Sequence, residues 1–264
     1  MSNLHRGAQV AEGVYTTLLW RSGPPPTWPY HLARLQRDAA QLDLPAPPVA
    51  ELSNRIGDYL AGRPVDSGAS TPLLRLRIRW WGEGGDVLTE PALTGQWDLF
   101  ARPLMATERP GAPQRLRSAG PARFPRRWAG AKITSIGEDL AWRRWAIAHG
   151  ADDALLCDAA GQWSESPTAA ILVGLADGRV GTPGPHNWPV RSTTLEAMAQ
   201  QMLAAGGVEL AQLCIGPADL GLVRWMMLVN ATAGGRPGAA VDGTLLQPPP
   251  QLWLDLAQSL TKPC

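Results

Sequence analysis

Lysine is rare in this sequence, and one of its two lysines stands where it could do chemistry. The sequence has two lysines, Lys132 and Lys262, and 22 arginines, so arginine is its usual cationic residue. A lysine amine can form a Schiff base with an aldehyde, whereas a guanidinium at neutral pH cannot. Lys132 lies in "AGAKITS", just ahead of a segment with helical spacing. It is therefore a candidate catalytic residue, and an ordinary surface lysine is the alternative.

Composition limits the other kinds of chemistry. The net charge is +1, so no overall field favours nucleic acid or an anionic membrane. The three cysteines are far apart and contain no CxxC pattern, which argues against a metal site or a disulfide framework and for a reducing compartment. No apolar signal core or stretch of 18 apolar residues is present. We expect a cytoplasmic protein without metal, nucleic acid or membrane partners.

The elements that must position Lys132 mix helices and strands. Apolar residues at 32, 35, 39 and 42 have helical spacing, and leucine and isoleucine alternate with arginine over 73–81, as in a strand with one buried face. The polar, proline-rich segment 105–113 is the best candidate for a linker. In the first half we expect strands at 13–20, 73–81 and 95–104 and helices at 29–44 and 48–62.

The second half continues the mixture, with a helix at 136–149 that Gly150 ends. Further strands are expected at 153–158, 169–175, 209–216 and 223–232, and further helices at 192–207, 217–222 and 247–260. The strands are joined by several hairpin-like turns, so the fold class is α+β rather than a doubly wound sheet.

Five stretches, in order along nearly the whole chain, resemble the sequence patterns of one enzyme family. They are "HRGAQVAEGVYTT", "HLARLQRDAAQL", "AKITSIGEDLAWRRWAIAHGADDALLCD", "GQWSESPTAAILV" and "LVNATAGGRP". The chain resembles the fold-type IV enzymes that use pyridoxal phosphate, which include branched-chain and D-amino-acid aminotransferases and aminodeoxychorismate lyase. The resemblance implies a two-domain architecture like that of D-amino-acid aminotransferase and a homodimer.

In this architecture residues 1–104 form a small α/β sandwich that lacks the family's first strands. Residues 105–113 form the linker, and residues 114–264 form a larger β-barrel-like domain carrying the lysine.

The resemblance also implies roles for individual residues. Lys132 would hold pyridoxal phosphate and move the substrate proton, and Glu165 would pair with the pyridine nitrogen, where an anionic partner keeps the nitrogen protonated. Arg34 would bind the phosphate through its guanidinium. The remaining implied phosphate ligands are Thr232 and the main chain at Val190 and Arg191, before a helix.

The chain departs from the family pattern at three positions near these residues. Ser135 and Ala170 stand where the family has asparagine, and Pro189, which has no N–H, lies in the usual glycine-isoleucine-threonine phosphate turn. A catalytically degenerate relative therefore remains an alternative.

The opening stretch bears on the reaction. Tyr15-Thr16-Thr17 resembles the lyase, whereas the aminotransferases usually have phenylalanine-glutamate-threonine. This favours a lyase that converts 4-amino-4-deoxychorismate to 4-aminobenzoate and pyruvate, a step of folate synthesis, with a class IV aminotransferase as the alternative. The substrate is a dicarboxylate, so cationic groups should line its pocket, and Arg77, Arg79 and Arg123 are the candidates. Thr16 of the opening stretch is a further candidate substrate contact.

Overall fold

The computed structural model describes residues 10–62, 72–86, 89–104, 113–121, 130–184, 189–207 and 209–263. The chain divides into two compact units. The first contains the described residues of Met1–Met105, Ala131–Ser135 and Lys262–Cys264, and the second those of Ala106–Gly130 and Ile136–Thr261. Residues 131–135 and 262–264, which the sequence predicts in the second domain, belong to the first unit, and Ile133 pairs there with a strand.

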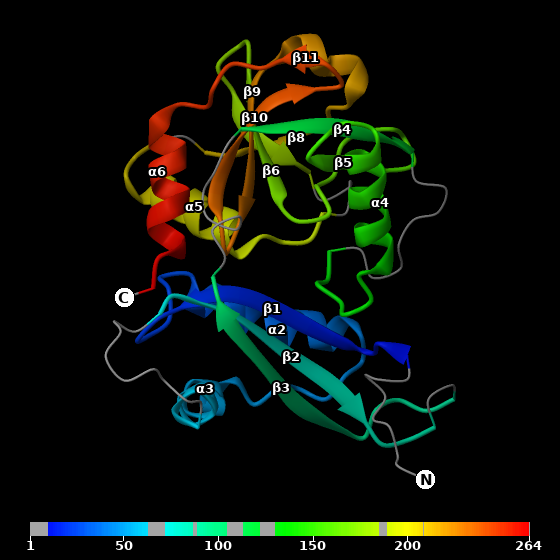
Figure 1. The fold of residues 1–264 in the computed structure, drawn as a ribbon, viewed down its shortest axis with the longest axis vertical. Coiled ribbons are helices and arrows are strands. Elements are labelled where there is room, and N and C mark those ends of the chain that lie inside the picture. Colours follow the sequence, from blue (N-terminus) through cyan, green and yellow to red (C-terminus); the bar gives the residue numbers. More distant parts are fainter. Residues whose placement is uncertain are drawn as a thin grey trace. The chain divides into compact units, whose positions relative to one another are not determined.

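The first unit is a three-stranded antiparallel sheet with two helices (Figure 1). Its strands are β1 (Gly13–Trp20), β2 (Leu74–Glu83) and β3 (Thr94–Pro103), in the order β1-β2-β3. The helices are α2 (Trp28–Gln41) and α3 (Leu52–Ala61), and a short 3-10 turn η1 (Val49–Glu51) leads into α3. All three strands and both helices match the expected elements, with boundary shifts of a few residues.

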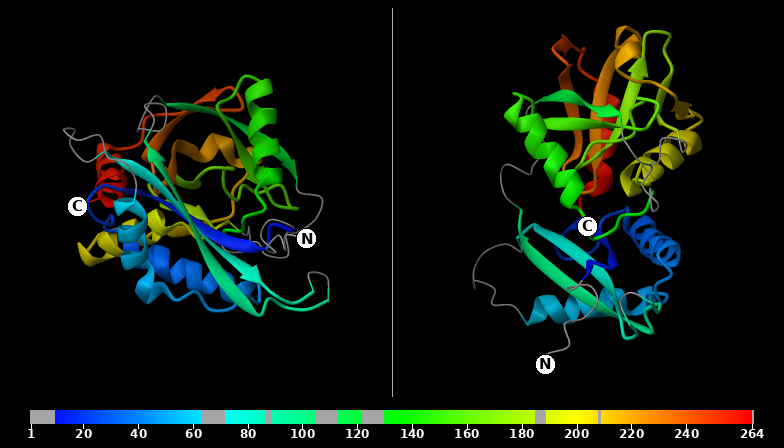
Figure 2. Two further views of the ribbon diagram at one scale, coloured as in Figure 1. Left: turned by 60° about the horizontal axis from the view of Figure 1, so that its bottom comes forward. Right: turned by 90° about the vertical axis from the view of Figure 1, so that its right-hand side faces the viewer.

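The core of the first unit lies between one face of the sheet and both helices. Figure 2 shows the ribbon of this sheet and its helices in two further views. Strand alternation places Leu18, Leu76 and Ile78 on this face, and all three are fully buried. Leu35 of α2 and Ile56 of α3 pack against them. The predicted alternation of β2 is thus confirmed, and the opposite face carries Tyr15, Thr17 and the arginines of β2.

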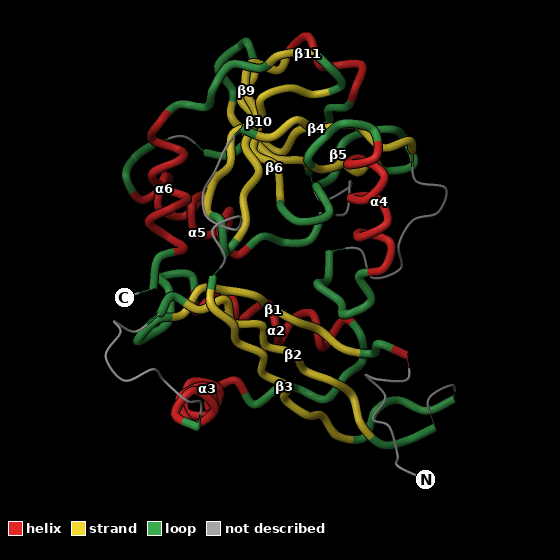
Figure 3. Tube along the Cα trace, in the orientation of Figure 1, coloured by secondary structure: helices red, strands yellow, loops and turns green. Residues whose placement is uncertain are grey.

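The second unit contains an eight-stranded mixed sheet among its described residues (Figure 3). The order is β5-β4-β10-β9-β6-β7-β8, and β11 pairs with β10. The strands are β4 (Gln114–Pro121), β5 (Asp153–Cys157), β6 (Ala170–Leu175), β7 (Val180–Pro183), β8 (Ala211–Leu213), β9 (Val223–Asn230), β10 (Gly234–Val241) and β11 (Thr244–Leu245). Sequence analysis missed β4, β7, β10 and β11.

Three helices and a 3-10 segment complete this unit: α4 (Gly137–Ala148), α5 (Thr193–Ala204), η4 (Pro217–Leu222) and α6 (Gln251–Thr261). Gly150, with a φ of 78°, follows α4, and the Ser192 hydroxyl caps α5 by accepting the Leu195 N–H over 3.3 Å. Helix α4 packs against β5, α6 against β10, and α5 against β9 and α6.

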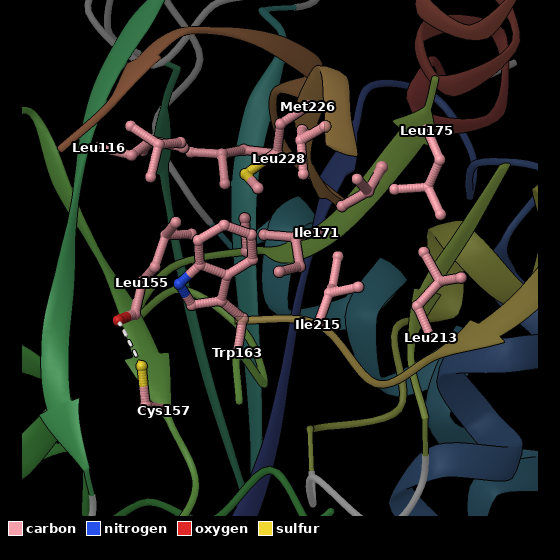
Figure 4. Packing of buried hydrophobic residues seen from close by; sticks show 14 residues of the cluster. Leu116, Leu155, Cys157, Trp163, Ile171, Leu175, Leu213, Ile215, Met226 and Leu228 are labelled. Carbon is pink, nitrogen blue, oxygen red and sulfur yellow. Dashed lines mark hydrogen bonds between the residues drawn. The ribbon is translucent and has the colours of Figure 1, made fainter. Parts of the chain in front are cut away.

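The main core of the second unit gathers around the indole of Trp163, which is fully buried (Figure 4). Leu155, Ile171 and Met226 come from three different strands and are also fully buried. A smaller cluster around Ala146 packs α4 onto the other face of β4 and β5. Because both faces of β5 are covered, its sequence "DALLC" is a mainly apolar run rather than an alternating one. Within the described residues, no helix is long and apolar enough to cross a membrane.

Candidate active site

Lys132 lies on an irregular segment that pairs with the free edge of β1. Ile133 forms an isolated antiparallel bridge with Val14, and the Tyr15 N–H donates to the Lys132 carbonyl over 3.0 Å. The Lys132 N–H donates over 2.8 Å to the carboxylate of Asp38 on α2. Both main-chain polar groups of Lys132 therefore have partners, which fixes the point from which its side chain extends.

The amine of Lys132 and the guanidinium of Arg77 lie at the same aromatic ring. Lys132 Nζ is 4.8 Å from the centroid of the Tyr15 ring, and Arg77 Cζ is also 4.8 Å from it. Each distance is within the range of a cation–π contact. Arg77 also donates from Nε to the Thr17 hydroxyl over 3.4 Å. Burial is the main cause that lowers the pKa of the Arg77 guanidinium from its usual range.

The other predicted substrate arginines are placed differently. The guanidinium of Arg79 pairs with Asp98, which lies opposite it on β3. Among the residues that the structure describes, Arg77 has no carboxylate partner. Because its charge is not compensated by an ion pair, Arg77 is better suited than Arg79 to bind an anionic substrate. Arg123 lies outside the described residues.

Arg34 and Thr16 meet in the interior of the first unit. Arg34 is 5% exposed and Thr16 is fully buried, on the sheet face that α2 covers. The Arg34 guanidinium donates to the Thr16 hydroxyl, whose oxygen lies 2.6 Å from Nδ1 of His31. Thr16, proposed from the sequence as a substrate contact, is thus placed to hold Arg34 and His31.

The surroundings of His31 favour its neutral form. A guanidinium can only donate, so the Thr16 oxygen accepts from Arg34, and the same hydroxyl lies within hydrogen-bond distance of His31 Nδ1, which donates or accepts according to the ring tautomer. The pKa of His31 is held well below 6.5, first by burial and then by the charges of Arg34 and Lys132. All of this keeps His31 neutral.

In the second unit, Glu165 follows the tight turn after β5. Its main-chain carbonyl accepts the Leu156 N–H over 2.8 Å, which keeps the segment beside β5. Its carboxylate accepts the Val190 N–H over 3.2 Å. The structure therefore brings together Glu165 and Val190, two residues that sequence analysis assigned separately to the cofactor.

A buried carboxylate holds the segment that follows Glu165. Asp153 is 2% exposed and accepts the hydroxyls of Ser166 over 3.0 Å and of Thr168 over 2.6 Å. Burial raises the pKa of Asp153, and its hydrogen bonds offset part of that effect. The carbonyl of Thr168 in turn accepts the side-chain amide of Asn230 over 3.2 Å.

Asn230 also builds the turn that contains Thr232. Its carboxamide oxygen accepts the Thr232 N–H over 3.0 Å, the Thr232 hydroxyl over 3.1 Å and the Ala233 N–H over 2.8 Å. The Glu165 segment and the Thr232 turn are therefore joined through one asparagine.

The start of α5 offers further groups for an anion. The Arg191 N–H points to the Gly130 carbonyl at 3.5 Å, and Gly130 precedes Lys132 by two residues. The Arg191 guanidinium pairs with Glu196 at 2.7 Å. In the first turn of α5, the Thr194 hydroxyl is fully buried and has no hydrogen-bond partner among the described residues. A buried hydroxyl at a helix start is suited to an anionic ligand.

Sequence analysis did not assign roles to His31, Asp38, Asp153 or Asn230. The spacing of His31, Arg34 and Asp38 along one helix could have pointed to the first two, because it places three polar residues on the face that a helix normally buries. No comparable local signal distinguishes Asp153 or Asn230.

Comparison with known proteins gives a consistent picture. The family model for class IV aminotransferases matches residues 13–241. A protein of Mycobacterium tuberculosis named bifunctional aminodeoxychorismate lyase / D-amino acid transaminase is 28% identical over 207 residues, which cover 74% of this chain and 70% of that protein.

Two solved structures have similar folds. A hypothetical aminotransferase from Mycobacterium tuberculosis, solved in a PLP-bound form, is 21% identical with a TM-score of 0.82; the match covers 99% of this chain and 93% of the other. A fold IV transaminase from Curtobacterium pusillum is 25% identical with a TM-score of 0.79, covering 99% of this chain and 87% of the other.

Proposed function

The chain belongs to the class IV aminotransferase family, and from this premise we propose that it is a lyase converting 4-amino-4-deoxychorismate to 4-aminobenzoate and pyruvate. The family and the fold-type IV architecture predicted from the sequence are confirmed. The enzymes of this family use pyridoxal phosphate, which confirms the predicted cofactor.

The residues present fit this cofactor. Lys132 supplies the amine that would hold it, and Glu165 supplies the carboxylate for the pyridine nitrogen. The Val190 N–H and the Thr232 hydroxyl would donate to the phosphate in place of their present acceptors, Glu165 and Asn230. The buried Thr194 hydroxyl, which has no hydrogen-bond partner among the described residues, is a further candidate donor. Arg34 remains a proposed phosphate ligand, held in place by Thr16.

When bound, pyridoxal phosphate withdraws electrons from the amine-bearing carbon of the substrate. Lys132 would take the proton from that carbon with its amine. Arg77, which lies at the same Tyr15 ring as the Lys132 amine, would bind a substrate carboxylate and so help to hold the substrate. Loss of pyruvate then leaves an aromatic product, so no amino acceptor is needed.

The single observation that carries the proposal is this pairing of Lys132 and Arg77 at Tyr15. It puts a proton-accepting amine and an arginine without a carboxylate partner among the described residues at one aromatic ring, and an anionic amino substrate needs both groups. Tyr15-Thr16-Thr17 favours the lyase among the family's reactions. An aminotransferase is the second candidate, and the name of the bifunctional Mycobacterium tuberculosis relative supports testing both activities.

Two measurements separate these functions. The purified protein should show a visible absorption band that borohydride removes, and should release pyruvate from aminodeoxychorismate without an amino acceptor. A band that a simple amino acid converts to the amine form of the cofactor, without pyruvate release, would instead indicate the aminotransferase. If added pyridoxal phosphate produces no band, the chain is a degenerate relative.

Lys132→Ala and Lys132→Arg test the site within that function. Both should lack the band, because neither side chain can hold an aldehyde, while Lys262→Arg should keep it. A band that persists in Lys132→Ala would contradict the assignment of Lys132.

We also propose a homodimer, as the family resemblance implies. Sedimentation at micromolar concentration should give about twice the mass of one chain, and a monomer across that range would contradict the proposal.

A further inference from the structure

Helix α2 buries a stripe of polar residues. His31, Arg34 and Asp38 are spaced by three and four residues, which places them on one face of the helix, and their exposed fractions are 0%, 5% and 1%. Burying charged groups is costly unless they are hydrogen-bonded. Arg34 and His31 meet Thr16 of β1, as described above, whereas Asp38 reaches the main chain of the lysine segment.

The two oxygens of the Asp38 carboxylate have separate partners. Oδ1 accepts from Arg37, from Nε over 3.1 Å and from a terminal guanidinium nitrogen over 2.9 Å. Oδ2 accepts the Lys132 N–H over 2.8 Å. Arg37 thereby orients the carboxylate and compensates its charge, which leaves the second oxygen directed at Lys132.

We infer that Asp38 is a positioning residue for Lys132, an inference that rests on the proposed function. The segment 131–135 has no regular secondary structure, and β1 fixes it on one side: the Lys132 carbonyl accepts from Tyr15, and the Thr134 N–H and hydroxyl donate to the Gly13 carbonyl over 2.9 and 3.1 Å. The opposite polar group, the Lys132 N–H, is fixed by Asp38. The carboxylate thus sets the main-chain orientation that places the amine at the Tyr15 ring.

The first test uses the protein without cofactor. In the wild type, hydrogen exchange of the Lys132 amide should be slowed about a hundredfold or more relative to an unstructured peptide, because the bond joins a buried charged acceptor. Asp38→Leu, similar in shape but without an acceptor, should speed this exchange about tenfold or more. Asp38→Asn retains an oxygen acceptor and should stay within about threefold of the wild type. The matched control is Asp58→Leu at an exposed position of α3, which should change nothing.

The second test measures the rate constant with which each protein captures added pyridoxal phosphate, followed by the visible band. Asp38→Leu should capture it about tenfold more slowly and Asp38→Asn at nearly the wild-type rate. A wild type that captures no cofactor would overturn the proposed function and leave the exchange result to decide the role of Asp38.

Three outcomes would overturn the inference about Asp38. One is an unprotected Lys132 amide in the wild type, a measurement that stands even if Asp38→Leu does not fold. Another is a folded Asp38→Leu protein with wild-type exchange and capture. The third is Asp38→Asn behaving like Asp38→Leu, which would mean that the charge rather than the acceptor matters.

Discussion

Replacing His31 by asparagine should remove a large part of the acid sensitivity of the first unit. The ring of His31 is fully buried, and its pKa lies well below 6.5 because of burial and the neighbouring charges of Arg34 and Lys132. In the unfolded chain the same group titrates near its ordinary value, about 6.5. Below that pH the unfolded state therefore binds a proton that the folded state refuses.

This difference in pKa sets the sign and size of the pH dependence of stability. When the pKa is lower in the folded state, the stabilising contribution is fully present above the pKa of the unfolded state and is lost as the pH falls toward the pKa of the folded state. Each pH unit in that window costs about 1.4 kcal/mol, so the contribution of His31 should fall by about 2 kcal/mol between pH 6.5 and pH 5.0. Asparagine has no titrating group, and its amide can either accept from or donate to the Thr16 hydroxyl close to the position of Nδ1.

The assay is urea unfolding of the wild type and His31→Asn at several pH values from 7.5 to 5.0. The free energy of unfolding of the wild type relative to the variant should decline by about 2 kcal/mol over the acidic part of that range. His149→Asn, which changes an exposed histidine just after α4, serves as the matched control for the substitution itself. A difference between wild type and His31→Asn that stays constant with pH would refute the reasoning.

Three further predictions concern other parts of the molecule. Because the pKa of Asp153 is raised, its stabilising contribution is greatest below about pH 4 and declines as pH rises, so the stability of the wild type relative to Asp153→Asn should fall from pH 4 upward in urea titrations. Arg77→Ala should raise the KM for the dicarboxylate substrate about tenfold or more, measured by pyruvate release, since a charge-assisted contact is lost. Gly174→Ala should lower the free energy of unfolding by about 2 kcal/mol, because its new Cβ would lie 2.1 Å from the Trp225 ring. Gly57→Ala is the control: this position on α3 is in open space and alanine favours the helix, so the free energy of unfolding should rise by about 0.5–1 kcal/mol.

The sequence predicts the elements whose local pattern agrees with their final environment. Strand β1 has the predicted bounds, and α2 spans Trp28–Gln41 against the predicted 29–44, because β-branched residues and helical spacing act over neighbouring residues. Strand β10 was missed because "GGRPGAAV" combines glycines with a proline, which are depleted in strands. Its pairing with β9 and β4 is a tertiary effect, and Pro237 is accommodated beside an irregularity in the β4 pairing.

The candidate site was predictable only in part, for a related reason. The resemblance assigned residues such as Lys132 and Glu165 by type and order, and these assignments rest on segments of a few residues each. The contact between Asp38 and Lys132 joins residues 94 positions apart, and no local pattern encodes it. The pairing of Arg79 with Asp98, which distinguishes Arg79 from Arg77, likewise depends on strand register.

The segments that carry the candidate chemistry share one means of support. Lys132 and Glu165 lie on irregular chain, and each such segment is held by a side chain that belongs to a regular element, Asp38 of α2 in one case and Asp153 of β5 in the other. Asn230, at the end of β9, does the same for the turn that follows it. An irregular segment can expose reactive groups but has no regular hydrogen bonds to hold its own conformation. A neighbouring helix or strand must therefore supply the hydrogen-bond acceptors that hold it. Substitutions at these acceptors should therefore alter the site without removing any group that touches cofactor or substrate.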